Sequence, residues 1–230
     1  MQLLSEIVTI DGPSGGGKST ISRLLAKSLG YAFLDTGAMY RAVGLAVQRA
    51  GLAVEEGAPL ASLLAGLEIS LVASAGETGV ILNGEDISGV IRSPEMAMLA
   101  SRVSALPMVR CYLTDLQRQI RTRGSIVTEG RDTGTVVFPN AAHKFFLDAT
   151  PEERARRRVA QLREQGREVN EAEILVQIIE RDRADTSRAH APLQPAADAV
   201  IVDSSRLDIA GVVAVMLEQI KRNRCVKGAL

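Results

Sequence analysis

The chain has 230 residues, of which 46% are hydrophobic, enough for a real core and incompatible with a disordered chain. Its 27 basic and 27 acidic residues cancel, which argues against binding to a nucleic-acid polymer, since such binding usually goes with a basic excess. Two distant cysteines, no signal-peptide pattern and no apolar run long enough to span a membrane lead us to expect a cytoplasmic protein without a disulfide framework or a membrane partner.

The first part of the chain alternates strand and helix. An apolar run within residues 5–11 predicts a buried strand that leads into a glycine-rich turn. Residues 18–29 carry one apolar helical face, and Gly30 stands where a helix-ending glycine is expected. A short strand over residues 32–35 and a helix over residues 36–50 follow. This order is typical of a parallel sheet covered by helices.

The segment from about residue 61 to residue 92 breaks this alternation. Apolar and polar residues alternate from Leu67 to Leu71, and Val80-Ile81-Leu82 reads as another strand. Asn83-Gly84 is a strong signal for a type I′ hairpin turn. We therefore predict a small antiparallel β insertion in the α/β core.

The rest of the chain returns to helices and strands. Thr150-Pro151-Glu152-Glu153 has the form of a capping box and begins an arginine-rich helix that Gly166 ends, and Asn170 caps the next helix. The remaining predicted elements are helices over 93–105 and from Pro107 to Gly124, strands over 125–129 and 144–148, a helix over 171–188, a strand over 199–202 and a helix over 208–222.

A phosphate-binding loop is the most specific motif in the chain. Gly12-Pro13-Ser14-Gly15-Gly16-Gly17-Lys18-Ser19 fits G-x-x-x-x-G-K-[ST] between a predicted strand and a predicted helix, which is the context that the motif requires. Backbone N–H groups and the helix N-terminus are expected to cradle phosphate, with Lys18 bridging the β- and γ-oxygens and the Ser19 hydroxyl on Mg²⁺. The predicted ATP-binding residues are Gly12, Pro13, Ser14, Gly15, Gly16, Gly17, Lys18, Ser19 and Thr20.

The loop indicates a nucleoside triphosphate but not the reaction. The chain has no Asn-Lys-x-Asp, which argues against a GTPase switch and leaves a small kinase as the better interpretation. Such an enzyme brings two polyanions together, so it needs arginines beside the acceptor and in a closing lid that excludes water. A phosphate monoester is already an ionised nucleophile, so no general base is required.

Four segments together resemble the bacterial cytidylate kinases. They are IDGPSGGGKST (10–20), LDTGAMYR (34–41), EGRDTGTVVFP (129–139) and RDRADTSR (181–188). The resemblance covers nearly the whole chain, including the β insertion. At Glu129 the chain departs from the family's usual Asp, although it keeps a carboxylate that could support Mg²⁺ through water.

The resemblance implies ATP- and Mg²⁺-dependent phosphorylation of CMP and dCMP to CDP and dCDP in pyrimidine nucleotide metabolism. The implied fold is an α/β P-loop kinase, a three-layer sandwich with a five-stranded parallel sheet, a small antiparallel insertion and a helical lid. We expect one monomeric domain over residues 1–230. Its parts are a core over 1–60, 93–150 and 189–230, an insertion over about 61–92 and a lid over about 151–188.

The resemblance also implies roles for single residues. The implied catalytic residues are Lys18, Arg131, Arg157 and Arg158. The implied substrate-binding residues are Thr36, Arg41, Ser101, Arg110, Arg131, Asp132, Arg181, Asp185 and Arg188. Within this set, Arg41 and Arg131 are expected on the CMP phosphate, Asp132, Arg110, Ser101 and Arg188 on cytosine, and Asp185 with Arg181 on the ribose.

The residues alone leave other interpretations open. Arg41 and Ser101 could be ordinary helix-surface residues, and Arg181 with Asp185 could be a plain i,i+4 pair. Glu152 with Arg156 and Glu153 with Arg157 have the same spacing. Arg154 and Arg158 form a like-charge i,i+4 pair, which costs energy unless an anion lies between them, so this argument favours those two as lid residues.

Two alternatives to a cytidylate kinase stay open. One is another small-molecule kinase of this kind, such as a UMP or shikimate kinase. The other is a non-catalytic nucleotide-binding module, against which the joint presence of the phosphate-loop lysine and the lid arginines argues.

Overall fold

A computed structural model describes residues 5–74, 77–121, 124–164 and 166–228. The chain divides into two compact units, Met1–Ala32 with Gly124–Leu230, and Phe33–Arg123. The arrangement as a single domain with the core, insertion and lid boundaries expected from the sequence stays a prediction.

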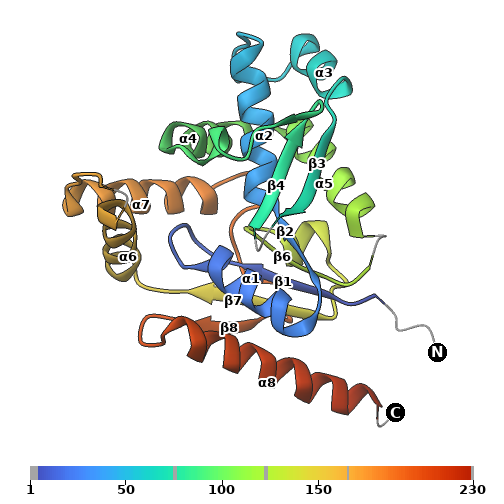
Figure 1. Ribbon diagram of the computed structural model, residues 1–230, viewed down its shortest axis with the longest axis vertical. Coiled ribbons are helices and arrows are strands. Elements are labelled where there is room, and N and C mark those ends of the chain that lie inside the picture. The colour runs from blue at the N-terminus through green and yellow to red at the C-terminus, as the bar shows by residue number, and fades with distance from the viewer. Residues whose placement is uncertain (1–4, 75–76, 122–123, 165, 229–230) are drawn as a thin grey trace. The chain divides into compact units, whose positions relative to one another are not determined.

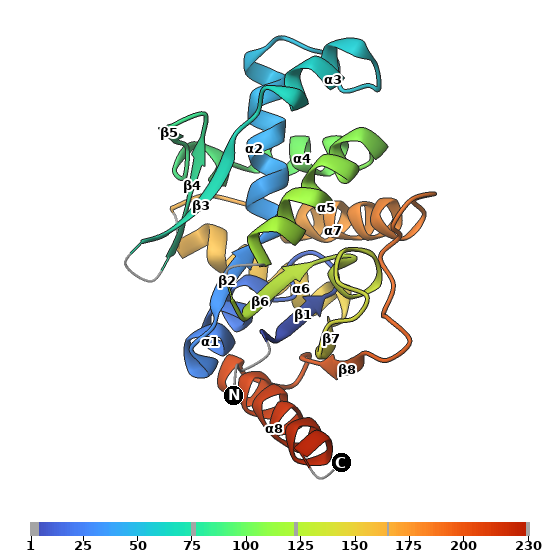
Figure 2. The same ribbon diagram turned by 90° about the vertical axis from the view of Figure 1, so that its right-hand side faces the viewer.

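A five-stranded sheet has the order β2-β6-β1-β7-β8 (Figures 1 and 2), and its strands β6, β1, β7 and β8 lie in the first unit. The pairs β1–β6, β1–β7 and β7–β8 are all parallel, as predicted for an α/β fold. The strands are β1 (Ile7–Asp11), β2 (Ala32–Asp35), β6 (Ile126–Gly130), β7 (His143–Asp148) and β8 (Val200–Asp203). Every residue of β1 is buried, which matches its uninterrupted apolar pattern.

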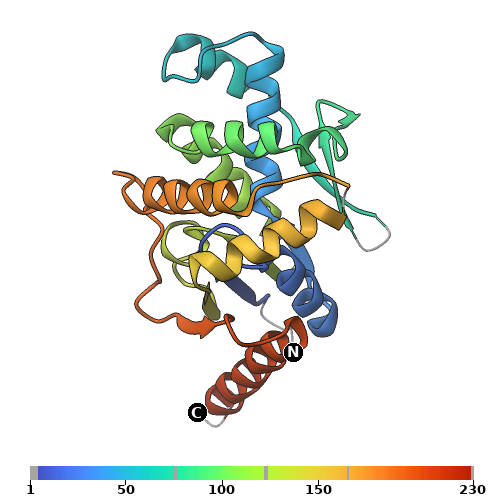
Figure 3. The same cartoon turned by 90° about the vertical axis from the view of Figure 1, so that its left-hand side faces the viewer.

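Four helices and one irregular turn complete this unit. They are α1 (Lys18–Leu29), α6 (Pro151–Glu164), α7 (Glu171–Thr186), α8 (Ile209–Gly228) and the π-helical turn η2 (Thr133–Val137). Helix α1 packs against β1, β6 and α8, while α6 and α7 lie side by side, as Figure 3 shows. The turn η2 was not predicted, and α8 extends beyond the residue 222 expected from the sequence.

The predicted caps at Gly30, Thr150, Gly166 and Asn170 are confirmed. Gly30 and Gly166 take positive φ angles at the ends of α1 and α6. The Thr150 hydroxyl accepts a hydrogen bond from the Glu153 N–H (3.3 Å), and the Asn170 side chain accepts one from the Ala172 N–H (3.0 Å). Local capping chemistry therefore sets these boundaries.

The second unit combines helices with a small antiparallel sheet of order β3-β4-β5. Its elements are α2 (Thr36–Arg49), α3 (Ala58–Ala65), β3 (Ile69–Ser74), β4 (Glu77–Leu82), β5 (Glu85–Asp86), the 3₁₀ turn η1 (Val90–Arg92), α4 (Pro94–Val103) and α5 (Pro107–Arg121). Asn83 (φ 48°) and Gly84 (φ 84°) form the two-residue turn between β4 and β5, so the predicted I′ hairpin is confirmed. Helix α3 occupies residues where the sequence indicated the start of the β insertion.

The register of the parallel strands decides what meets at their carboxyl ends. Asp11 at the end of β1 pairs with Gly130 at the end of β6. The phosphate loop leaves the sheet after Asp11 and the segment with Arg131 and Asp132 leaves it after Gly130, so the two segments start side by side. Ligands of open parallel sheets bind at this edge. Among the described helices, none combines the length and apolar character needed to cross a membrane.

Candidate nucleotide site

Three glycines give the phosphate loop its shape. Gly12, Gly15 and Gly17 have φ angles of 148°, 77° and 83°, a region that side chains rarely tolerate. A Cβ atom on Gly12 would lie 2.1 Å from the carbonyl oxygen of Leu147 on β7. The loop can therefore pass this strand only with glycine at that position, and it delivers Gly17 as the residue that precedes α1.

Lys18 lies under this loop and is buried. Its ammonium group donates a hydrogen bond back to the Pro13 carbonyl oxygen at the start of the loop. Burial, followed by repulsion from Arg131 and Arg181, lowers the pKa of Lys18 to about 7, although Glu129 and Asp11 act in the opposite direction. Neighbouring cations repel one another, so an anion such as phosphate bound among them would stabilise their charged forms.

Arg131, Asp185 and Arg188 form one hydrogen-bonded network. The Arg131 Nε donates to Asp185 Oδ2 (2.8 Å), and Arg188 donates to the other oxygen of the same carboxylate. Asp185 is buried, which raises its pKa, but Arg131 and Arg188 outweigh this and hold the pKa of the carboxyl below its usual value. The structure thus brings together Arg131, Asp185 and Arg188, which the sequence predicted separately.

The carboxylate of Asp185 accepts hydrogen bonds from Arg131 after the end of β6 and from Arg188 just after α7. Arg181, four residues before Asp185 on α7, acts on both Asp185 and Lys18 through its charge. It therefore lies in the electrostatic field of the phosphate loop.

Arg154 anchors helix α6 to the phosphate loop. It is 3% exposed and donates to the carbonyl oxygens of Ala149 (2.9 Å) and Ser14 (3.0 Å), while it pairs with Asp182 on α7 at 2.6 Å. Asp182 is therefore an anion that offsets the charge of Arg154, whose i,i+4 spacing with Arg158 is otherwise unfavourable. The lid role of Arg154 and Arg158 stays a prediction.

Two other arginines of α6 take different partners. Arg157 donates to Glu153 (2.8 Å), as its i,i+4 spacing indicated, and also to the hydroxyl (3.1 Å) and carbonyl (2.6 Å) of Ser204 after β8. Arg158 is half-buried and donates to Gln161 (2.7 Å). Neither contact tests the catalytic role implied for these residues.

Arg156 does not use its predicted partner Glu152. Its guanidinium pairs with Glu153 in a two-point contact at 2.7 and 2.8 Å. Glu153 therefore serves both Arg156 and Arg157, and these hydrogen bonds, the one from Arg156 being the strongest, lower the pKa of its carboxyl to about 2.

The remaining predicted substrate residues belong to the second unit. The buried Arg110 donates to the Ser104 carbonyl (3.1 Å), and its guanidinium carbon lies 5.8 Å from the centre of the Tyr40 ring. The Ser104 hydroxyl donates to the Ser101 carbonyl (2.8 Å), so Ser101 and Arg110 share Ser104 as a neighbour. The Tyr40 ring therefore lies against the Arg110 guanidinium.

Thr36 and Arg41 lie on the first turns of α2. Thr36 is buried as its first residue, and Asp35 caps the helix by accepting from the Ala38 N–H (2.9 Å). Arg41 is half-buried. A nitrogen of its guanidinium lies 4.0 Å from the position that a Cβ atom on Gly37 would take, which is an ordinary van der Waals distance.

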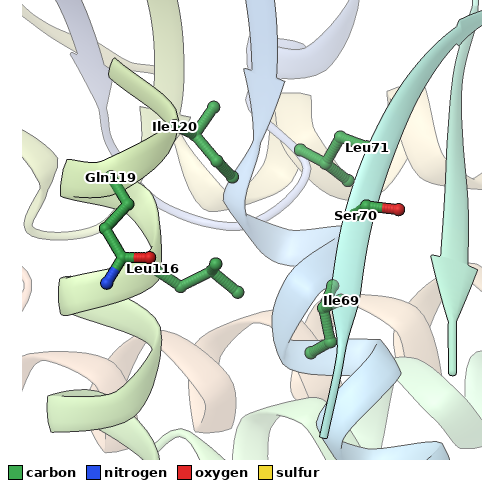
Figure 4. Close-up of a pocket in the computed structure, with 6 residues that line it drawn as sticks. All are labelled: Ile69, Ser70, Leu71, Leu116, Gln119 and Ile120. Atoms are coloured by element: carbon green, nitrogen blue, oxygen red, sulfur yellow. The ribbon is translucent and has the colours of Figure 1, made fainter. Parts of the chain in front are cut away.

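A small hollow lies in the second unit between β3 and α5 (Figure 4). Its volume is about 120 Å³, and its walls contain none of the predicted site residues. Sites for small-molecule ligands usually measure roughly 300–1,000 Å³, so this hollow cannot enclose a nucleotide. It is lined by Ile69, Ser70, Leu71, Leu116, Gln119 and Ile120.

Sequence reasoning missed two residues that hold the site together, Asp182 and Asp11. Asp182 on α7 pairs with Arg154 of α6, which in turn donates to the phosphate loop at Ser14. Asp11 joins the end of β1 to the segment after Arg131 and Asp132. Asp182 lies inside the quoted segment 181–188 and Asp11 inside the segment 10–20, but only the fold shows what they contact.

Sequence comparison points to one group of proteins. The model of the cytidylate kinase family matches residues 8–222. The cytidylate kinase of Syntrophotalea carbinolica is 49% identical over 220 residues, 96% of this chain and 94% of its own. That of Geobacter sulfurreducens is 49% identical over 224 residues (97% and 96%), and that of Pasteurella multocida 44% over 221 residues (96% and 97%).

Proposed function

The chain belongs to the cytidylate kinase family, and on this premise we propose that it transfers the γ-phosphoryl group of ATP to CMP, giving ADP and CDP. The observation that carries the proposal is the convergence of Lys18, Arg131 and Arg181 beside a glycine loop shaped for phosphate. Lys18 serves the donor, whereas the two arginines come from the segments that follow β6 and end α7. dCMP is proposed as a second acceptor, because none of the expected phosphate and base contacts requires a 2′-hydroxyl.

The donor side uses the phosphate loop. Backbone N–H groups of the loop and the N-terminus of α1 bind the β-phosphate, and Lys18 neutralises the oxygen that bridges to the γ-phosphate as negative charge grows on it. Because the pKa of Lys18 is lowered to about 7, the side chain is only partly charged near neutral pH, and the bound phosphates would restore its full charge. Gly17 precedes α1 and so places Ser19 in the first turn, at the end of the helix that follows the phosphate loop.

The residues present fit Mg²⁺. The ion usually keeps several waters and takes one or two protein oxygens in addition to the nucleotide phosphates. The Ser19 hydroxyl offers one oxygen, and the buried carboxylate of Glu129, close enough to Lys18 to affect its pKa, offers support through water. When bound, the ion would neutralise charge on the β- and γ-phosphates.

The acceptor side uses the arginines. Arg131 and Arg41 bind the CMP phosphate and orient one of its oxygens towards the γ-phosphorus, and Arg181, expected on the ribose, adds positive charge near Lys18. This oxygen forms the new P–O bond while the bond to the β–γ bridging oxygen breaks, and no proton has to be removed. Asp185 is expected to accept from the ribose hydroxyls, and Asp132, Arg110, Ser101 and Arg188 to bind cytosine.

The lid contributes charge and excludes water. Arg157 is held by Ser204 in this structure, so it has to leave that contact before it can reach a phosphoryl group. Arg158, which donates to Gln161 one turn along α6, is the second candidate of the lid. An arginine that joins the transition state in this way accelerates phosphoryl transfer by up to about 10³–10⁵. Action as a monomer in the cytoplasm stays a prediction.

One acceptor panel tests the proposal. ADP release from ATP would be followed with CMP, dCMP, UMP and shikimate in turn. We expect CMP to give the highest kcat/KM and dCMP to follow. A higher kcat/KM with UMP or shikimate would overturn the proposal in favour of another small-molecule kinase, and no ADP release with any acceptor would indicate a non-catalytic module.

A further inference from the structure

Both oxygens of the Asp11 carboxylate accept hydrogen bonds from the segment that follows Asp132. Its Oδ1 accepts hydrogen bonds from the N–H (2.9 Å) and the hydroxyl (2.7 Å) of Thr133, and its Oδ2 accepts from the N–H of Gly134 (2.7 Å). Asp11 is 4% exposed, so these bonds are made away from water. A buried carboxylate with three donors is among the stronger polar arrangements in a protein.

The segment has little room to adopt another position. A Cβ atom on Gly134 would lie 2.8 Å from the Thr9 hydroxyl and 3.3 Å from Asp11 Oδ2. Gly134 therefore lets the backbone approach β1 closely enough for its N–H to reach the carboxylate. The same segment then turns into η2, where the Val136 N–H donates to the Asp132 carbonyl at 2.8 Å.

Asp11 thus belongs to two functional segments at once. The residue after it is Gly12, whose φ of 148° and tight passage by Leu147 begin the phosphate loop. The residues before its hydrogen-bond partner Thr133 are Arg131 and Asp132, which are expected to bind the acceptor. One carboxylate therefore connects the start of the donor loop to the acceptor loop at a sequence separation of 122 residues.

We propose that Asp11 is a positioning residue that holds Arg131 and Asp132 in place for the acceptor nucleotide. This inference rests on the proposed function for the identity of the acceptor. It differs from a purely structural role in what it predicts. If Asp11 positions the acceptor segment, its loss affects CMP more than ATP, because the phosphate loop has its own anchors in the glycines, in Lys18 and in Arg154.

The first variant is Asp11→Asn, which keeps the size of the side chain. Its amide can accept through Oδ1, but its NH₂ group then faces the Gly134 N–H, donor against donor. Loss of one charge-assisted hydrogen bond corresponds to about 10- to 100-fold in an equilibrium constant. We expect the KM for CMP and the Kd for CMP measured without ATP to rise by a factor in this range, while the KM for ATP changes by less than about 3-fold.

A pair of variants at the partner residue keeps the test valid if Asp11→Asn does not fold. Thr133→Val removes the hydroxyl and retains the N–H, so the KM for CMP should rise by roughly 3- to 10-fold, the effect of one neutral hydrogen bond. Thr133→Ser retains the hydroxyl and should restore a KM within about 2-fold of wild type. As a matched control, Asp148→Asn alters an exposed carboxylate at the end of β7 that accepts a hydrogen bond from the Ala149 N–H, and it should leave both KM values unchanged.

Hydrogen–deuterium exchange of residues 132–137 in the free protein supplies a readout that needs no substrate. Exchange there should be faster in Asp11→Asn and Thr133→Val than in wild type and Asp148→Asn. Unchanged exchange, or equal rises in the KM for ATP and for CMP, would overturn the positioning role. If the wild-type protein does not phosphorylate CMP, the proposed function fails, whereas the exchange data still decide whether Asp11 holds the segment.

Discussion

Arg154→Met is the sharpest stability test that the structure offers. The substitution keeps the apolar stem of the side chain but removes a guanidinium that is 3% exposed. It leaves Asp182 without its 2.6 Å partner and the Ser14 and Ala149 carbonyls without a donor. The native helix α6 would therefore lose its main polar attachment to the phosphate loop and to α7.

The size of the loss follows from burial. Removal of one partner of a buried ion pair costs about 3–5 kcal/mol, because the remaining charge stays in a poor solvent. For a chain of this length that corresponds to a decrease in Tm of roughly 6–20 °C. Arg156→Met on the same helix is the matched control. Arg156 is 66% exposed and its pair with Glu153 is a surface contact, so the loss should stay below about 1 kcal/mol.

The assay is thermal and urea unfolding of the two variants beside wild type, together with the KM for ATP. We expect Arg154→Met to raise the KM for ATP, because Ser14 is part of the phosphate loop, and Arg156→Met to leave it unchanged. The double variant Arg154→Met/Asp182→Asn should regain part of the stability, because it removes the unpaired charge. Equal, small losses in Arg154→Met and Arg156→Met would refute the reasoning that burial decides the value of these pairs.

Four further predictions concern chemistry and specificity. Burial and Arg131 lower the pKa of Lys18 to about 7 in the free protein, and bound phosphate would raise this pKa. At pH 8 the binding of ATP should therefore be accompanied by the uptake of close to one proton, and the affinity for ATP should fall as the pH rises above 7. Calorimetry in buffers of different ionisation enthalpy measures this uptake, and a Lys18→Met variant that takes up as many protons would contradict the assignment. Lys18→Met should also lower kcat far more than it weakens CMP binding, and near-normal turnover would exclude the proposed role. Asp132→Ala should lower the CMP/UMP ratio of kcat/KM, since a site that hydrogen-bonds one base edge can discriminate by up to ~10⁴–10⁵; equal losses on both acceptors would show that Asp132 does not read the base. Arg158→Ala should reduce kcat by up to about 10³, measured with saturating ATP and CMP, and an unchanged kcat would remove Arg158 from the transition state.

The sequence by itself determined the features that depend on neighbouring residues. The phosphate loop followed from eight consecutive residues and their flanks, and the hairpin from Asn83-Gly84, since each has its own φ requirements. The helix ends at Gly30, Gly166 and Asn170 followed from capping chemistry within one turn. The parallel sheet followed from the alternation of strand and helix, and the family from four segments whose combination is specific.

The tertiary structure alone decided the contacts between distant segments. Asp11 meets Thr133 and Gly134 only because β1 and β6 pair in one register, and Arg154 meets Ser14 only because α6 packs beside the loop. The like-charge spacing of Arg154 and Arg158 on α6 indicated the need for an anion, but only the fold shows that Asp182 on another helix pairs with Arg154. Local patterns carry no information on such partners, because hydrogen bonds and ion pairs between segments depend on packing geometry, which the whole fold creates.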